Sequence, residues 1–239
     1  MQKLGCKIID IDNHILPLVD DGSVDMDEAV NSIKYLQTMG VRDIVLTSHY
    51  IPNTKYDVSV IERRKILKKL QTVTEDIDIN LYLGSEVYIS DSDTLIKLLN
   101  ENKITTLNQS RYLLLEFPKY QDFKQVMKVI CDLNDMGLVP VISHVEKYAY
   151  VKKNFDKFRE LLDLDCIMMG NITSVLNRNR IVLKKLLKED MIKILATNFH
   201  HRPCRIDKAI KKLKKVIPDK KLDELLYKNS KKVLENKKI

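Results

Sequence analysis

The chain has 239 residues, of which 44% are hydrophobic and 31% are charged, as is typical of a globular protein. Its 41 Lys and Arg exceed its 33 Asp and Glu, so the formal charge is +8. With only 6 Gly and 6 Pro, collagen-like and low-complexity chains are excluded. No apolar run approaches the roughly 20 residues that span a bilayer, and residues 1–12 show no signal-peptide pattern. We therefore predict a cytoplasmic protein.

The cysteines and the basic runs limit the kinds of protein and of binding partner that the sequence allows. The 4 cysteines are far apart and show no C-x-x-C spacing, so we expect reduced thiols and neither a disulfide framework nor a zinc ribbon. The positive charge leaves nucleic acid, anionic lipid and an acidic or phosphorylated partner open. We interpret the basic runs 63–70 and 211–215 as solvated helix faces. Docking of an acidic tail on Arg63–Lys69 is the alternative.

Short β-branched segments alternate with longer amphipathic segments along the chain. In chain order we predict strand 7–12, helix 27–39, strand 41–49, helix 59–72, strand 79–88, helix 93–100, strand 111–117, helix 123–136, strand 138–144, helix 154–163, strand 166–171, helix 182–189, strand 191–197, a basic helix from 206 and a final helical tail. Ser23 is expected to cap the first helix, and Gly40 and Gly137 to end theirs. This alternation predicts a parallel sheet that is covered on both faces.

Polar side chains stand at the carboxyl ends of these strands. They are His14, His49, Glu86, Glu116, His144, Asn171 and the pair Asn198 and His200. A doubly wound sheet and a closed barrel both fit the alternation, but only a barrel gathers every carboxyl end on one face. A single histidine at such a position more often caps a strand or accepts a hydrogen bond. Four of the 5 histidines at strand ends favour a multinuclear metal centre for Mn, Fe or Zn instead.

Six segments occur in the order and spacing of a known family. They are IDIDNHILPLVDDGS (9–23), LTSHY (46–50), LGSEVY (83–88), LLLEFP (113–118), VISHVEKY (141–148) and ATNFHHRP (196–203). The sequence resembles the polymerase-and-histidinol-phosphatase (PHP) superfamily, specifically the bacterial capsule and exopolysaccharide tyrosine-protein phosphatases. The resemblance covers essentially the whole chain, and NSKKVLENK (229–237) is similar to the family's closing helix. It implies one domain over 1–239, a distorted seven-stranded (β/α)7 TIM-like barrel of the PHP fold.

The resemblance also implies a ligand set for two or three divalent ions, usually manganese, with Fe or Zn as alternatives. One ion would be held by Asp12, His14, Glu86 and Asn198. A second would be held by Glu86, Glu116 and His144, and a third by Asp21, His49 and His200.

Three matched positions depart from the family pattern. Asp12 replaces a histidine and Asn198 replaces a carboxylate, both at the same expected ion, so that the net ligand charge is conserved. Lys147 replaces an arginine that is thought to hold the phosphate, and it lacks the bidentate fork of that residue. Arg202 and Arg205 are expected to supply the fork. We therefore assign roles at the phosphate to Lys147, Arg202 and Arg205.

The resemblance implies a metal-dependent phosphatase that hydrolyses phosphotyrosine on the tail of a membrane-associated tyrosine kinase, through a metal-bound hydroxide and without a nucleophilic cysteine. Membrane association is expected only through the kinase, and a homo-oligomer is compatible with the family. One alternative is a catalytically impaired homologue that binds the kinase as a regulator. Another is a phosphoesterase for small molecules or nucleic acid, although we find no nucleic-acid-binding pattern and expect no nucleic-acid partner.

Overall fold

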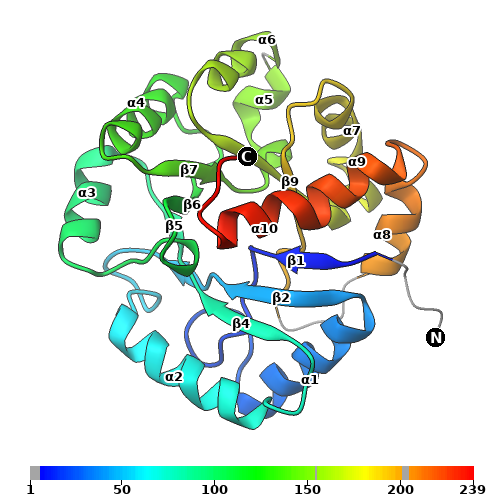
Figure 1. Ribbon diagram of the computed structural model, residues 1–239. Helices are drawn as coiled ribbons and strands as arrows, with labels where there is room; N and C mark the ends of the chain where they lie inside the picture. The colour runs from blue at the N-terminus through cyan, green and yellow to red at the C-terminus, as the bar shows by residue number, and fades with distance from the viewer. Residues whose placement is uncertain (1–5, 154, 201–204) are drawn as a thin grey trace.

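A computed structural model of the protein describes residues 6–153, 155–200 and 205–239. Strands lie at its centre, and helices surround them (Figure 1). The described strands are β1 (Ile8–Asp10), β2 (Val41–Leu46), β3 (His49–Tyr50), β4 (Asn80–Leu83), β5 (Glu86–Tyr88), β6 (Tyr112–Glu116), β7 (Val139–Ile142), β8 (Ile167–Asn171) and β9 (Ile194–Ala196). The described α-helices are α1 (Met26–Thr38), α2 (Val60–Val73), α3 (Ser92–Asn100), α4 (Phe123–Asp135), α5 (Ala149–Lys153), α6 (Phe155–Phe158), α7 (Arg180–Lys188), α8 (Ile206–Leu213), α9 (Asp219–Asp223) and α10 (Asn229–Leu234). None of these helices is long and apolar enough to cross a membrane.

The strands pair in parallel in two hydrogen-bonded sheets. Their orders are β1-β2-β4 and β3-β5-β6-β7-β8-β9. All seven predicted strand segments contain strand, which confirms the parallel α/β architecture. Two of the segments are interrupted, however, because 41–49 divides into β2 and β3, and 79–88 divides into β4 and β5. The apolar pattern does not reveal these breaks, since the chain stays buried through Thr47 and Ser48 and through Gly84 and Ser85.

Alternate side chains of the strands belong to two different hydrophobic clusters. On β6, Leu113 and Leu115 pack in the larger cluster with residues of the surrounding helices, whereas Tyr112 and Leu114 pack in a smaller one. The smaller cluster unites residues of β1, β2, β6, β7, β8 and β9. Because strands far apart in the sheet order contact one another there, the sheets curl around a common interior. Burial on both faces explains why the strands read as continuous apolar runs.

The segments that follow β1 and β9 lie side by side. Asn13 forms a parallel bridge with Phe199, and the buried Asp10 carboxylate joins the two segments more firmly. It accepts the Thr197 amide (2.8 Å), the Thr197 hydroxyl (2.5 Å) and the Asn13 side-chain amide (2.8 Å). Burial raises the pKa of Asp10 to about 6, although these hydrogen bonds lower it in part. The first and last strands are thus held together across 187 positions of sequence.

Two local predictions need correction. The cap of α1 is Asp25, whose carboxylate accepts the Glu28 amide at 2.8 Å, and the prediction of Ser23 is wrong. Asp25 and Glu28 stand three residues apart, the spacing of a capping box, whereas Met26 occupies that position relative to Ser23. The predicted helix 154–163 is a short α-helix, α6, followed by a 3-10 helix over Arg159–Asp163.

The C-terminal segment closes the amino ends of the strands. α9 continues through a π-helical turn into α10, which lies in front of the strands in Figure 1. Asn236, two residues beyond the end of α10, has a left-handed φ of 53°, and the Lys237 amide donates back to the Lys232 carbonyl at 2.8 Å. The Asn236 side chain accepts the Arg111 amide at 2.8 Å, and the Tyr112 hydroxyl donates to the Lys237 carbonyl at 2.7 Å.

Asn236 therefore has two separable roles, which two substitutions distinguish. Asn236→Ala removes the hydrogen bond to Arg111 and strains the left-handed turn, so we expect the free energy of unfolding to fall by about 2 kcal/mol. Asn236→Gly removes only the hydrogen bond and should cost about 1 kcal/mol. Urea denaturation measures both. Equal losses in the two variants would show that the left-handed turn does not contribute.

Candidate metal centre

The predicted ligands come together at the carboxyl ends of the strands. His49 and Glu86 follow the carboxyl ends of β2 and β4 and begin the short strands β3 and β5, Glu116 ends β6, and His144 follows β7. The others lie on connections: Asp12, His14 and Asp21 after β1, and Asn198 and His200 after β9. This placement follows from parallel pairing, which brings all carboxyl ends to one side.

Glu86 is the central carboxylate of this group. One oxygen lies 3.3 Å from His14 Nε2 and 3.1 Å from His49 Nδ1, and the other lies 3.3 Å from His144 Nε2. The side chain is completely buried. Burial would raise the pKa of Glu86, but the three neighbouring imidazoles hold that pKa well below its ordinary value. The carboxylate is therefore ionised and available as a ligand.

Two further carboxylates flank Glu86. His14 Nε2 also lies 3.3 Å from an Asp12 oxygen, and His144 Nε2 lies 3.3 Å from a Glu116 oxygen. Ligand atoms of Asp12, His14 and Glu86 form one compact group, and those of His49, Glu86 and Glu116 form another.

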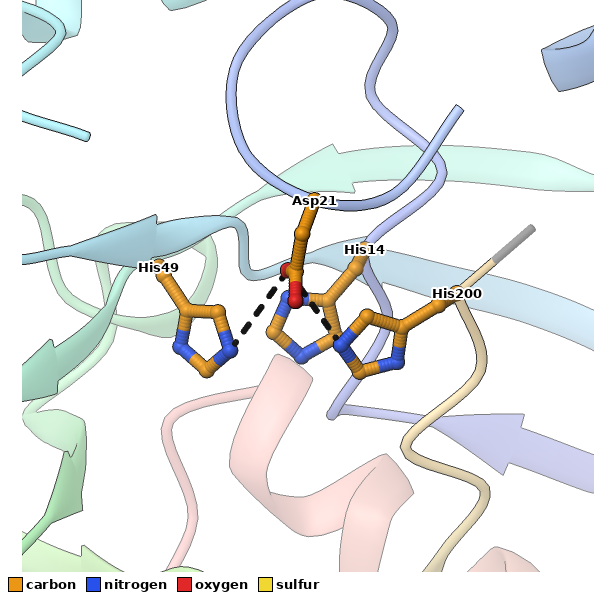
Figure 2. A group of neighbouring side chains, drawn as sticks. All are labelled: His14, Asp21, His49 and His200. Atoms are coloured by element: carbon orange, nitrogen blue, oxygen red, sulfur yellow. Dashed lines mark ion pairs between the residues drawn. The ribbon is translucent and has the colours of Figure 1, made fainter. Parts of the chain in front are cut away.

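A third group contains Asp21, which extends from the connection after β1 toward the histidines (Figure 2). One Asp21 oxygen lies 3.4 Å from His200 Nε2 and 3.9 Å from His49 Nε2. The rings of His14 and His200 are stacked with centroids 4.1 Å apart. The ligand atoms of His14, Asp21, His49 and His200 lie within 4.8 Å of one another. The three groups overlap with the three expected ion sites, but His14 joins the group of Asp21, His49 and His200, and His49 stands in place of His144 beside Glu86 and Glu116.

The chemistry of these residues fits divalent ions. Two ligand atoms at about 2.1 Å from one ion are about 3.0–3.4 Å apart, depending on the coordination angle, and most of the distances above are 3.1–3.4 Å. Several buried atoms also have no hydrogen-bond partner among the described residues. They are Asp12 Oδ1, His14 Nε2, His49 Nδ1, both Glu86 carboxylate oxygens and Asn198 Oδ1. Buried polar atoms without partners are costly, and shared cations would satisfy them.

Asp20 is a functional residue that the sequence reasoning missed. Its fully buried carboxylate lies 2.7 Å from His14 Nδ1, so that His14 Nε2 faces Asp12 and Glu86. It also accepts the His49 amide at 2.7 Å. Burial would raise the pKa of Asp20, but His14 outweighs that effect and holds the pKa below its ordinary value. The adjacent acids in the DDG sequence were the available signal, since a carboxylate beside a ligand histidine commonly orients it.

Backbone strain marks two of the predicted ligands. His144 and Asn198 have left-handed φ angles of 31° and 49°. Such angles are uncommon for residues other than glycine and are most often tolerated by Asn. At His144 this angle accompanies a ring that lies against the Glu86 and Glu116 carboxylates.

The other predicted site residues have different positions. Lys147 ends a 3-10 helix that begins just after His144. Burial and the charge of Glu86 raise the pKa of Glu116, and the charge of Lys147 offsets part of that rise. Arg205 is exposed and directly precedes α8, whereas Arg202 lies outside the described residues. Asn171 caps the following 3-10 helix by accepting the Thr173 amide at 2.8 Å.

The solvated interpretation of the run 63–70 is wrong for one residue. Arg63 is completely buried, whereas Arg64, Lys65, Lys68 and Lys69 are exposed. Arg63 lies four residues before the buried Leu67, on the inner face of α2, a periodicity that the charge run concealed.

The fold and the convergent ligands define a class, the parallel α/β domains that carry a cluster of histidines and carboxylates at the strand ends. A solved structure described as YwqE from Bacillus subtilis and CpsB from Streptococcus pneumoniae, metal-dependent tyrosine phosphatases, superposes with a TM-score of 0.85. The identity is 23%, over 97% of this chain and 96% of that chain. The histidinol phosphate phosphatase of Lactococcus lactis, complexed with Zn, L-histidinol and phosphate, gives a TM-score of 0.60 at 14% identity over 89% and 93% of the chains. These likenesses show the fold.

Residues 8–235 match the family model for capsular polysaccharide synthesis, CpsB/CapC. The chain belongs to this family, which confirms the resemblance inferred from the six segments. CapC of Staphylococcus aureus is 32% identical over 97% of this chain and 93% of that protein. The tyrosine-protein phosphatase CpsB of Streptococcus pneumoniae is 29% identical over 95% of this chain and 98% of that protein.

Replacing Asp20 tests its orienting role. Asp20→Asn should lower the affinity for Mn²⁺ by about 10–100-fold, because His14 loses the carboxylate that fixes its ring. Competition with a chromophoric chelator measures the dissociation constant. Asp27→Asn, an exposed change on α1, is the matched control and should leave the affinity unchanged. Unaltered Mn²⁺ binding by Asp20→Asn would contradict the role.

Proposed function

We propose that the protein is a metal-dependent tyrosine-protein phosphatase of capsule or exopolysaccharide synthesis. The observation that carries the proposal is the buried Glu86 carboxylate shared by three imidazoles, in a chain of the CpsB/CapC family. Its relatives CpsB and YwqE are named tyrosine-protein phosphatases. From these relatives we infer the substrate class, which is phosphotyrosine in proteins.

Divalent ions, with manganese as our first choice and Fe or Zn as alternatives, fit the three groups of ligand atoms. Asp12, His14, Glu86 and Asn198 would hold one ion. Glu86, Glu116 and His144 would hold a second, with His49 close by, and Asp21, His49 and His200 a third. Such ions supply positive charge for the phosphoryl oxygens and lower the pKa of a coordinated water.

The chain's own cations complete the site. Lys147, whose charge acts on Glu116 and His144, would offset the charge on the phosphoryl oxygens, and Arg205 would approach from the start of α8, with Arg202 as a further candidate. A phenolate leaving group, whose conjugate acid has a pKa of about 10, needs less protonation than an alkoxide. The residues thus have to position the phosphate and shield its charge more than they have to donate a proton.

A kinase tail that carries phosphotyrosine fits the surroundings of the site. Lys55 lies 5.0 Å from the Tyr56 ring centre, and that ring lies 6.3 Å from the ring of His49. Lys119 and Tyr120 form a similar pair at 5.1 Å, on the connection that follows Glu116. Paired cationic and aromatic side chains suit an acidic peptide that contains aromatic residues.

We further infer that the two sheets form one interrupted seven-stranded barrel in a single domain. The Thr47 amide donates to the Asn13 carbonyl at 2.8 Å, and the Glu86 amide donates to the Thr47 carbonyl at 3.3 Å. These bonds continue the pairing across the breaks between β2 and β3 and between β4 and β5. The bridge between Asn13 and Phe199 supports closure of the ring.

Metal removal tests the proposed activity. Phosphate release from a phosphotyrosine peptide should be lost after dialysis against a chelator and should return with Mn²⁺. Cys131→Ser and Cys204→Ser should retain activity, because we assign no nucleophilic cysteine. Burial raises the pKa of a third thiol, Cys166, to about 12, which makes it a poor nucleophile. Chelator-resistant turnover that a serine substitution abolishes would contradict the proposal.

The same peptide separates the enzyme from a kinase-binding regulator. Tight binding of the phosphopeptide with no Mn²⁺-dependent phosphate release would favour the regulator. The specific observation behind this second candidate is Asn198, whose buried side-chain oxygen offers an ion a neutral amide in place of a carboxylate.

The ion beside Asp12 and Asn198 should bind more weakly than the others. Asn198→Asp adds a negative charge at a ligand position, so we expect tighter Mn²⁺ binding and faster turnover. Asp12→His alone should help less, because it removes a charge while Asn198 remains neutral. Elemental analysis and titration of the bound ions measure the effect. Equally tight binding of every ion by the unaltered protein would show that Asp12 already compensates for Asn198.

A further inference from the structure

Arg63 is a completely buried cation behind the metal centre. It lies in the first turn of α2, which Ser59 caps by accepting the Glu62 amide. Burial lowers the pKa of Arg63 to about 10, and its Nε has no hydrogen-bond partner among the described residues. A charge removed from water in this way is costly, so its contacts must explain its presence.

The guanidinium donates to the break between β4 and β5. Its Nη1 lies 2.9 Å from the Ser85 hydroxyl and 3.3 Å from the Gly84 carbonyl, and its Nη2 lies 3.2 Å from the Lys103 carbonyl. The Ser85 hydroxyl also accepts the Thr105 amide at 3.0 Å. One planar fork therefore connects α2, the strand break and the segment after α3.

The break is tightly packed. A Cβ at Gly84 would lie 2.9 Å from side-chain atoms of Val45, Thr47 and Leu107, so only glycine fits without a shift. The residue that follows Ser85 is Glu86, the carboxylate shared by His14, His49 and His144. Any displacement of the break is therefore passed directly to the central ligand.

The opposite side of the guanidinium faces the residue that follows His49. The Arg63 Cζ atom lies 5.8 Å from the centre of the Tyr50 ring. The Tyr50 hydroxyl donates to the Asp57 carboxylate at 2.6 Å. Because β3 pairs with β5 through His49 and Glu86, Arg63 supports both strands immediately beside their ligands.

We propose that Arg63 is a positioning residue for the metal centre, which fixes Glu86 through the Gly84–Ser85 break. This inference rests on the proposed metal centre. Arg63 does not contact substrate, since its side chain is inaccessible to solvent. Its loss should therefore reduce metal affinity and turnover number and leave the KM for an aryl phosphate nearly unchanged.

The test compares Mn²⁺ binding of the full chain and its variants, at a temperature where each is folded by circular dichroism. Arg63→Lys keeps the charge but loses the fork, and Arg63→Met loses both. We expect each to bind Mn²⁺ about 10–100-fold more weakly and to change the visible spectrum of the Co²⁺-substituted protein. Arg64→Met, an exposed change one residue away, is the matched control and should alter neither.

Ser85→Ala provides a second route if the Arg63 variants do not fold. It removes the acceptor of the shortest Arg63 hydrogen bond and should weaken Mn²⁺ binding in the same way. Where both fold, the double variant Arg63→Met/Ser85→Ala should lose less affinity than the sum of the single losses, because both act at one contact.

Two results have different meanings. Wild-type Mn²⁺ affinity and an unchanged Co²⁺ spectrum in the Arg63 and Ser85 variants would overturn the positioning role and leave the metal centre intact. Failure of the unaltered protein to bind Mn²⁺, Fe²⁺ or Zn²⁺ would overturn the proposed centre itself, and the role of Arg63 with it.

Discussion

The Glu86 carboxylate, buried among three imidazoles, is the constraint on which the rest of the structure depends. An ionised carboxylate that is buried away from solvent is stable only when its partners have the correct geometry. Those partners follow three strands that are distant in sequence, and each is within 3.1–3.3 Å. The parallel arrangement supplies that convergence, since it is the architecture in which every strand ends at the same side.

Precision at this point requires support from behind the ligands. Asp20 orients one imidazole, and Asp10 joins the segments on which the first and last ligands lie. The interruptions of the strands also help to position the ligands. The register is the same on both sides of the breaks, since Leu46 pairs with Leu83 and His49 pairs with Glu86, so that His49 and Glu86 begin new short strands side by side. The irregularities of the sheet are thus part of the site.

Much of the architecture was predictable because it depends on periodic patterns. Buried parallel strands require apolar side chains on both faces, and the chemistry that remains at their ends is visible as His14, His49 or His144. The breaks at Thr47 and Gly84 were not predictable, because burial continues through them. Asp20 and Arg63 were missed for a related reason. Each is a charged residue beside other charged residues, and only three-dimensional packing distinguishes the buried member of such a run from its solvated neighbours.

The closing contacts between the two ends of the chain determine when the protein can fold. The Asp10 network joins residues 187 positions apart, and the contacts of the C-terminal tail with Arg111 span 125. During synthesis, the Asp10 carboxylate lacks its Thr197 partner until nearly the whole polypeptide has been made. Contacts of such long range slow folding. The segments after β1 and β9 therefore come together only when translation is nearly complete, and the candidate ligands on the two segments meet only at that stage.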